Sequence, residues 1–181
     1  MREMTTMVYS FAELSETAQE RALNAFRCSN VEFNWWEDSY DTIRTAGKLL
    51  GLDIDMIYCD TDLYCIFDAS YEYVRGAVKA VKAEFPQDTE LHGIAKDLQA
   101  LQKRHFYSLS CAVREGRDMN QYSCFRFGED YDCDLGDILD EFAHWARILL
   151  RDECEGLTSD EAVKEMIEAN GYEFTENGKL V

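Results

Sequence analysis

The stretch FNWWEDSYDTIRTAGKLLG, residues 33–51, decides the centre of the fold. Its apolar residues and one glycine recur at steps of four, three, four and three, which is the spacing of one face of an α-helix. Gly51 stands where the left-handed C-terminal cap of such a helix belongs. We therefore expect an amphipathic helix that ends before Gly51 and turns inward Trp36, Tyr40, Ile43, Gly47 and Leu50.

The chain after Gly51 changes from helical spacing to strand patterning. Residues 52–60 (LDIDMIYCD) and 62–74 (DLYCIFDASYEYV) contain many β-forming residues, and apolar and polar side chains partly alternate in them. The polar residues 60–62 between the two segments suit a turn. This pattern predicts a β-hairpin directly after the helix.

Three more helices are expected after the hairpin, and the second and third of them have clear apolar faces. Residues 76–85 predict a short helix that Pro86 ends, because proline cannot continue a helix. Asp88 or Thr89 can cap the helix after it. The residues expected to face inward are Leu91, Ile94, Leu98, Leu101 and His105 in that helix, and Leu135, Ile138, Phe142, Trp145 and Leu149 in a long helix near the C-terminus.

Both ends of the chain carry signals that start and stop helices. A Ser or Thr side chain can cap the first turn, a Glu three residues later completes a capping box, and glycine ends a helix. These signals are Ser10 with Glu13, Ser15 before a helix to about Arg27, and Thr158 with Glu161 before a helix to Asn170 that Gly171 ends. We further expect a strand at 5–10, and the helix after Ser15 should turn inward Ala18, Ala22, Ala25 and Phe26. A tight turn is expected at Asn177 and Gly178.

Two more strands are expected in the middle of the chain, near 106–115 and 121–128. They should pair with each other around residues 116–120.

These segments together predict an α+β fold. The chain has 181 residues, 46% of them hydrophobic and 13% aromatic, which is enough to bury one sizeable core and too apolar for a disordered acidic tail. We expect a single domain, residues 1–181, with about five or six helices packed against an antiparallel sheet of short strands and hairpins.

The net charge limits the partners of this protein. It is −18, from 18 basic and 36 acidic residues, and such a charge repels DNA, RNA and anionic lipid. Residues 128–181 alone hold 16 acidic residues against 4 Lys and Arg. We therefore expect no direct binding to nucleic acid or membranes, and we expect a basic partner to be drawn to the last third of the chain.

The cysteines indicate a reducing compartment. All seven cysteines lack CxxC spacing, and their odd number leaves at least one outside any set of internal disulfides. The N-terminus does not resemble a signal peptide, and no stretch approaches the roughly 20 apolar residues of a membrane span. A reducing cytoplasm is the expected location.

The strongest charge feature is EDYDCDLGDILDE, residues 129–141, which holds seven carboxylates and no Lys or Arg. Asp137, Asp140 and Glu141 are three or four residues apart, so on a helix they are neighbours about 5–6 Å apart. This closeness is comparable with that of charges on a nucleic-acid backbone, and a basic groove could accept them as a DNA mimic. The expected partner-binding residues are Glu129, Asp130, Asp132, Asp134, Asp137, Asp140 and Glu141, and a merely solvated, solubilising surface stays open as the alternative.

Calcium binding is a second interpretation of the same stretch. With Asp130 as the first position of an EF-hand loop, Asp132, Asp134 and Glu141 fall at the third, fifth and twelfth positions. The sixth position, which needs glycine, is Leu135, and the preceding segment is strand-like. Carboxylates at a helix start are also simply favourable there, so we expect no metal at this site.

A metal-dependent phosphoester hydrolase is the enzyme alternative. Asp53 with Asp55, or Asp60 with Asp62, could hold magnesium against a phosphate. Each pair could equally be the solvated face of a strand, and no nucleophile elbow, zinc spacing or glycine-rich phosphate loop is present. We therefore expect no enzyme activity and no cofactor.

Several stretches resemble a known family. They are YSFAELSETAQERA (9–22), WWEDSYDTIRTAGKLLGLDID (35–55), YEYVRGAVKAVKAEFPQDTELHGIAKDLQALQKRHFY (71–107) and LTSDEAVKEMIEANGYEFTENG (157–178). In these the chain is similar to a widespread family of small acidic proteins encoded by phages and prophages. Relatives carry a glycine- and tryptophan-rich insertion between the central strands, which this chain lacks.

The resemblance implies a role against host defence. Some proteins associated with this group are anti-CRISPR inhibitors of the type II RNA-guided DNA nuclease, which holds its heteroduplex in a positively charged channel. It implies a stoichiometric inhibitor whose partner is a basic, nucleic-acid-binding host protein, namely a type II CRISPR effector nuclease with its guide RNA. A regulatory protein of phage growth stays open beside it.

Overall fold

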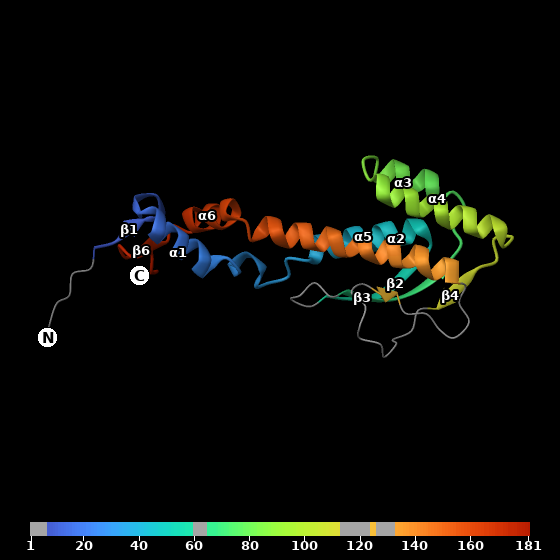
Figure 1. The fold of residues 1–181 in the computed structure, drawn as a ribbon, viewed down its shortest axis with the longest axis horizontal. Coiled ribbons are helices and arrows are strands. Elements are labelled where there is room, and N and C mark those ends of the chain that lie inside the picture. Colours follow the sequence, from blue (N-terminus) through green and yellow to red (C-terminus); the bar gives the residue numbers. More distant parts are fainter. Residues whose placement is uncertain (1–6, 60–64, 113–123, 126–132) are drawn as a thin grey trace. The chain divides into compact units, whose positions relative to one another are not determined.

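The computed structural model describes residues 7–59, 65–112, 124–125 and 133–181. Helices and short strands alternate along these residues, which confirms the α+β prediction (Figure 1). Contacts between residues divide the chain into two compact units. Unit 1 consists of Met1–Trp35 and Asp152–Val181, and unit 2 consists of Trp36–Arg151. That residues 1–181 behave as a single domain stays a prediction.

The predicted hairpin forms the centre of unit 2. Strand β2, Leu52–Cys59, pairs antiparallel with β3, Cys65–Glu72, and Leu52 lies opposite Tyr71. The expected turn at residues 60–62 lies outside the described residues. The register shifts between Ile54 and Met56, so the buried positions are Leu52, Ile54 and then Ile57. This bulge explains why the sequence alternates only in part.

Helix α2, Glu37–Leu50, packs closely onto this hairpin. A Cβ atom on Gly47 would lie 2.8 Å from the Cδ1 atom of Ile54, so any larger residue would have to displace the end of that side chain. Gly51 adopts a left-handed φ of 98°, as predicted, and a Cβ there would collide with the carbonyl oxygen of Glu72. The inward face is confirmed at Ile43, Gly47 and Leu50, whereas Trp36 and Tyr40 are only half-buried.

The other edge of β3 differs from the prediction. Strand β4, Ser110–Ala112, pairs antiparallel with residues 70–72 of β3, and β5, Cys124–Phe125, pairs parallel with residues 66–67 of β3. The expected hairpin between these two strands is therefore wrong within the described residues, because β3 supplies the partner of both. The expected turn at 116–120 lies outside those residues.

Three helices complete unit 2. They are α3, Ala77–Glu84, α4, Thr89–Arg104, and α5, Cys133–Leu157, whose last residues belong to unit 1. In α4 the predicted Leu91, Ile94, Leu98 and Leu101 are all buried, while His105 is half-buried just beyond the helix end. In α5 the predicted Leu135, Phe142 and Trp145 are buried, whereas Ile138 and Leu149 are only half-buried and their neighbours Leu139 and Leu150 are fully buried.

Unit 1 is a small α+β assembly with its own core. Strand β1, Tyr9–Ser10, pairs antiparallel with strand β6, Glu173–Phe174. The unit also contains helices α1, Glu16–Phe26, and α6, Asp160–Ala169. Two short 3-10 helices lie at Phe11–Glu13 and Ser29–Val31. The core consists of Phe11, Leu14, Ala18, Ala22, Val163, Ile167 and Phe174. Ala25 was expected inward and is exposed.

The predicted caps of unit 1 are confirmed with one correction. The Ser10 backbone N–H donates to the Glu13 carboxylate at 2.8 Å, and this bond lowers the pKa of Glu13. Ser15 caps α1. Ser159, not Thr158, caps α6 by accepting from the Ala162 N–H, because the Thr158 hydroxyl donates back to the Cys154 carbonyl.

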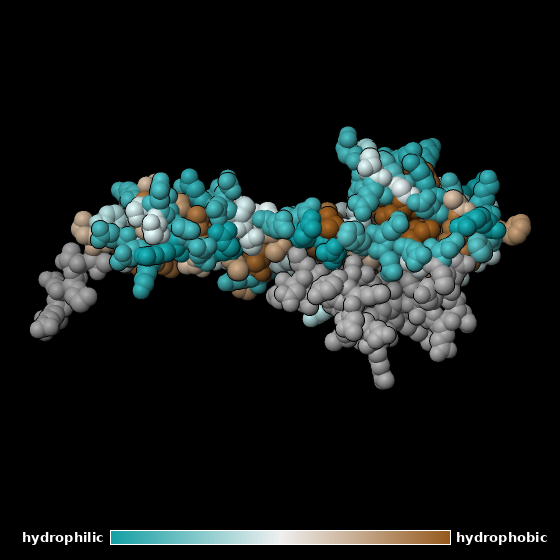
Figure 2. Space-filling model, in the orientation of Figure 1, coloured by the Kyte–Doolittle hydropathy of each residue, from teal (hydrophilic) through white to brown (hydrophobic). Residues whose placement is uncertain are grey.

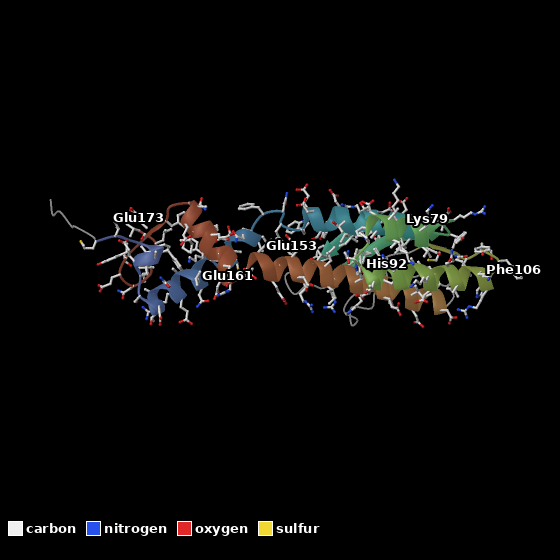
Figure 3. The ribbon with its side chains drawn as sticks, turned by 90° about the horizontal axis from the view of Figure 1, so that it is seen from above. Lys79, His92, Phe106, Glu153, Glu161 and Glu173 are labelled. Carbon is white, nitrogen blue, oxygen red and sulfur yellow. The ribbon has the colours of Figure 1, made fainter. Side chains whose placement is uncertain are left out.

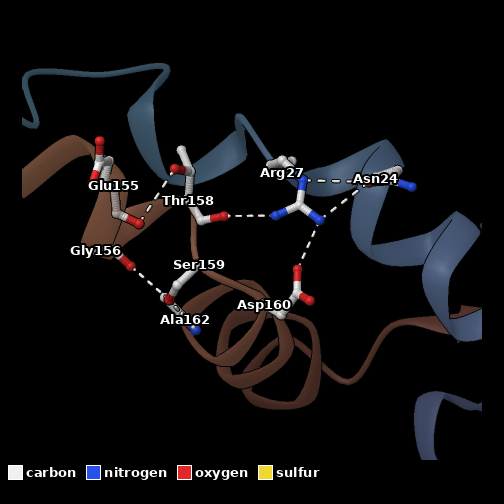
Figure 4. A network of polar contacts seen from close by, with 8 residues as sticks. All are labelled: Asn24, Arg27, Glu155, Gly156, Thr158, Ser159, Asp160 and Ala162. Carbon is white, nitrogen blue, oxygen red and sulfur yellow. Dashed lines mark hydrogen bonds and ion pairs between the residues drawn. The ribbon is translucent and has the colours of Figure 1, made fainter. Parts of the chain in front are cut away.

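A polar network joins the two chain segments of unit 1 (Figure 4). The Arg27 guanidinium donates to the Thr158 carbonyl at 3.0 Å and to the Asp160 carboxylate at 2.7 Å. Asn24 accepts from the same guanidinium.

At the C-terminus, the Gly178 N–H donates to the Thr175 carbonyl, and Gly178 adopts the left-handed conformation. This confirms the predicted tight turn at Asn177 and Gly178.

Candidate interaction surface

Helices α4 and α5 of unit 2 lie side by side and run antiparallel. Near the start of α4, the Trp145 indole N–H donates to the Asp88 carboxylate at 2.7 Å. At the other end of α4, the guanidinium of Arg104 lies 3.0 Å from the carboxylate of Asp134, near the start of α5. These two contacts fix the direction and register of α5 along α4.

Asp88 organises the first of these contacts with both carboxylate oxygens. One oxygen accepts from the Leu91 N–H at 2.8 Å and caps α4, and the other accepts from Trp145. The Trp145 ring also stacks on Phe142, with ring centroids 5.4 Å apart, and meets the edge of Phe85 at 6.4 Å. A single cap residue thus starts α4 and anchors α5 against it.

The register of the two helices produces a shallow, open hollow of about 370 Å³ between them. Its charged lining consists of carboxylates, and one histidine, His144, lies among them. None of the described residues that line it is Lys or Arg, but the Arg147 guanidinium lies beside it, 3.1 Å from the Nδ1 atom of His144. We call this the acidic hollow; it is lined by Glu90, Gly93, Ile94 and Asp97 of α4 and by Asp137, Asp140, Glu141 and His144 of α5.

The acidic hollow contains part of the predicted site. Asp137 and Glu141 are exposed in it and Asp140 is half-buried in it. Asp134 lies outside it and pairs with Arg104, which offsets its charge. The other predicted residues, Glu129, Asp130 and Asp132, lie outside the described residues.

The sequence interpretation missed the contribution of α4. Glu90 and Asp97 are exposed, seven residues apart and on the same side of α4, roughly 10 Å apart along its axis. This spacing was visible in the sequence. The packing of α5 beside that face was not, because it depends on the contact of Asp88 with Trp145.

The candidate metal ligands do not form a cluster in the part of the chain that the structure describes. Within it, no group of three or more His, Cys, Asp or Glu could hold a metal ion. Asp53 and Asp55 are exposed on β2 beside the bulge. Asp60, Asp62, Asp130 and Asp132 lie outside the described residues, so the calcium and magnesium alternatives stay untested at those positions.

Comparison with known families gives one match. Residues 35–160 match a family described as a domain of unknown function, DUF8835. The chain belongs to this family. The match covers all of unit 2 and continues to residue 160 in unit 1, so it includes α4, α5 and the acidic hollow. No curated protein and no solved structure matches the chain.

The face of the described residues drawn in Figure 2 is mainly polar. On the face shown in Figure 2, hydrophilic residues cover most of each unit, and hydrophobic colour is limited to small areas. None of the helices that the structure describes is both long and apolar enough to cross a membrane.

Proposed function

We propose that this DUF8835 protein is a binding protein without catalytic activity, which uses the acidic hollow to dock on a cationic surface of a protein that handles nucleic acid. The observation that carries the proposal is the position of four exposed carboxylates, those of Glu90, Asp97, Asp137 and Glu141, around one open hollow whose described lining residues include no Lys or Arg. Two separate helices supply them, so the charge is concentrated by the fold as well as by the sequence.

Electrostatics explains how such a surface finds its partner. A net charge of −18 attracts a basic protein over a distance and raises the rate of encounter. Neighbouring carboxylates on α5 are about 5–6 Å apart, so a groove that binds nucleic-acid phosphates could bind them instead. The attraction is screened by salt, which makes the proposal measurable.

The partner class that we propose is the type II CRISPR effector nuclease loaded with guide RNA. Such a nuclease holds a heteroduplex in a positively charged channel and reads a short duplex motif with arginines, and the acidic hollow is complementary to either surface. The resemblance to phage-encoded anti-defence proteins supports this choice of partner. The protein then acts as a stoichiometric inhibitor.

Charge reversal within the hollow tests the proposal. We expect the triple variant Asp97→Lys, Asp137→Lys and Glu141→Lys to lose at least about tenfold in affinity for the guide-loaded nuclease, and to lose inhibition of DNA cleavage. All three side chains are exposed, so the fold should tolerate the change, and circular dichroism checks this.

A matched control separates the hollow from net charge. The variant Asp41→Lys, Asp55→Lys and Glu84→Lys makes the same change in charge at exposed positions of unit 2 outside the hollow. We expect it to keep most of the affinity. Equal losses in both triple variants would show that the hollow has no special role.

A further inference from the structure

Two cysteines of unit 1, Cys28 and Cys154, lie where the two chain segments of that unit meet. Cys28 follows α1 and precedes the 3-10 helix Ser29–Val31, and Cys154 lies in the last turn of α5. Both are free thiols, with Cys28 exposed and Cys154 half-buried. The acidic hollow belongs to unit 2 and uses neither of them.

Hydrogen bonds on both sides of Cys28 hold its segment against the end of α5. Immediately before Cys28, the Arg27 guanidinium donates to the Thr158 carbonyl at 3.0 Å (Figure 4). Two residues after it, the side-chain N–H₂ of Asn30 donates to the Leu157 carbonyl at 3.0 Å. The backbone that contains Cys28 is therefore fixed beside the residues at which α5 ends.

Cys154 belongs to the same end of α5. Its carbonyl accepts from the Thr158 backbone N–H at 3.0 Å and from the Thr158 hydroxyl at 2.8 Å. Figure 3 labels Glu153, the residue before Cys154, where α5 passes beside the chain that follows α1. Thr158 bonds with Cys154 on one side and with Arg27, the neighbour of Cys28, on the other, so the two cysteines share one small region.

The Cys28 thiol is close enough to Cys154 to affect its ionisation. Burial raises the pKa of the Cys154 thiol, and the negative charges of ionised Cys28 and of Glu155 raise it further. Like charges oppose ionisation in this way when they are near each other. Cys154 is therefore a neutral thiol at pH 7, and the exposed Cys28 is the thiol that an oxidant in solution meets first.

We propose that Cys28 and Cys154 form a reversible disulfide when the protein meets an oxidant of the peroxide class. In a reducing compartment both thiols stay free, as they are in the structure. The bond joins the end of α1 to the end of α5, two segments that are far apart in the sequence. A disulfide that closes a long loop restricts the unfolded chain strongly, so oxidation stabilises unit 1.

The chemistry takes two steps. Peroxide first oxidises the Cys28 thiol to a sulfenic acid: a sulfur–oxygen bond forms, the oxygen–oxygen bond breaks and one water leaves. The sulfur of Cys154 then gives up its proton and attacks the Cys28 sulfur, and the hydroxyl leaves with that proton as a second water. The two thiols lose two electrons in all, and a thiol reductant reverses the bond by exchange.

Oxidation of the full chain tests the proposal directly. After dilute wild-type protein is treated with hydrogen peroxide and digested without reductant, we expect mass spectrometry to find peptides linked through Cys28 and Cys154. The unfolding temperature should rise by about 5 °C or more on oxidation, because the bond closes a long loop. Dithiothreitol should return it to the starting value.

Serine variants assign the effect to these two thiols. Cys28→Ser and Cys154→Ser replace partly accessible side chains with groups of similar size, and neither variant should show a rise on oxidation. Cys111→Ser is the control, because burial raises the pKa of the Cys111 thiol to about 11 and keeps it unreactive. The rise within each protein is compared, and the control should show the full rise.

Two results would overturn the proposal. One is an oxidised wild type without the linked pair of peptides, in which Cys28 carries only sulfinic acid or a disulfide to a second chain. The other is a rise in unfolding temperature in Cys28→Ser or Cys154→Ser that equals the rise in the wild type.

Discussion

Gln102 is a polar residue that lies entirely inside unit 2, although glutamine is usually found at the surface. Its side chain satisfies both backbone groups of Leu109 and meets the hydroxyl of Tyr71, whose pKa is raised by burial. Burial also raises the pKa of the nearby Cys111 thiol on β4 to about 11. The Gln102 and Tyr71 side chains are 0% and 1% exposed, so water cannot easily replace the hydrogen bonds that Gln102 makes.

The substitution Gln102→Leu tests this contact. It keeps a similar volume but leaves the partly buried N–H and carbonyl of Leu109 without the side chain that binds them, so we expect a loss of about 1–3 kcal/mol in the free energy of unfolding. Urea denaturation measures it. Gln99→Leu, at an exposed position of the same helix, is the control and should change stability by less than about 0.5 kcal/mol. Similar values for both variants would show that the network around Leu109 contributes little.

At the scale of the element, α4 was the most predictable part of the protein. Its cap at Asp88 and its four buried leucine and isoleucine positions follow from local spacing, and the structure confirms them. Helix α5 was harder to predict because adjacent apolar residues, such as Ile138 with Leu139 and Leu149 with Leu150, allow two different buried faces. The contact of Trp145 with Asp88, the cap of α4, fixes which face is buried, and these two residues are far apart in the sequence.

Strand pairing was the least predictable element. Strands β4 and β5 are only three and two residues long, and both use β3 as their partner. Short strands carry little alternation, and nothing in their own sequence distinguishes pairing with each other from pairing with an earlier strand. The bulge at Asp55, which has no partner residue on β3, also changed the faces of β2, and partial alternation in the sequence does not locate such a shift.

The dual role of Asp88 gives a prediction at this scale. Asp88→Ser retains a cap for α4 but withdraws the acceptor of the Trp145 indole, and we expect it to cost about 1–2 kcal/mol. Asp88→Ala loses both contacts and should cost about 1 kcal/mol more. Thermal or urea unfolding measures the two. Ser159→Ala removes the cap of α6 together with the bond from the Ser159 hydroxyl to the Gly156 carbonyl, so its cost sets an upper reference for the loss of a cap. Equal stabilities of the Ser and Ala variants of Asp88 would refute the capping role.

At the scale of the whole molecule, the sequence predicted the charge and only part of the site. The total of −18 and the position of Asp137, Asp140 and Glu141 on one helix were visible from composition and spacing. Their meeting with Glu90 and Asp97 needed the antiparallel packing of α4 and α5. Asp134 was expected to contact a partner, but it faces Arg104, a residue 30 positions away that local patterning does not connect with it.

The most direct test of the acidic hollow is the dependence of binding on salt. We would measure the affinity of the chain for the guide-loaded type II nuclease between about 0.1 M and about 0.5 M salt. The wild type and the control Asp41→Lys, Asp55→Lys and Glu84→Lys should lose affinity steeply and with similar slopes, whereas Asp97→Lys, Asp137→Lys and Glu141→Lys should bind weakly with a much smaller slope. Equal slopes and equal affinities for all three proteins would contradict the account.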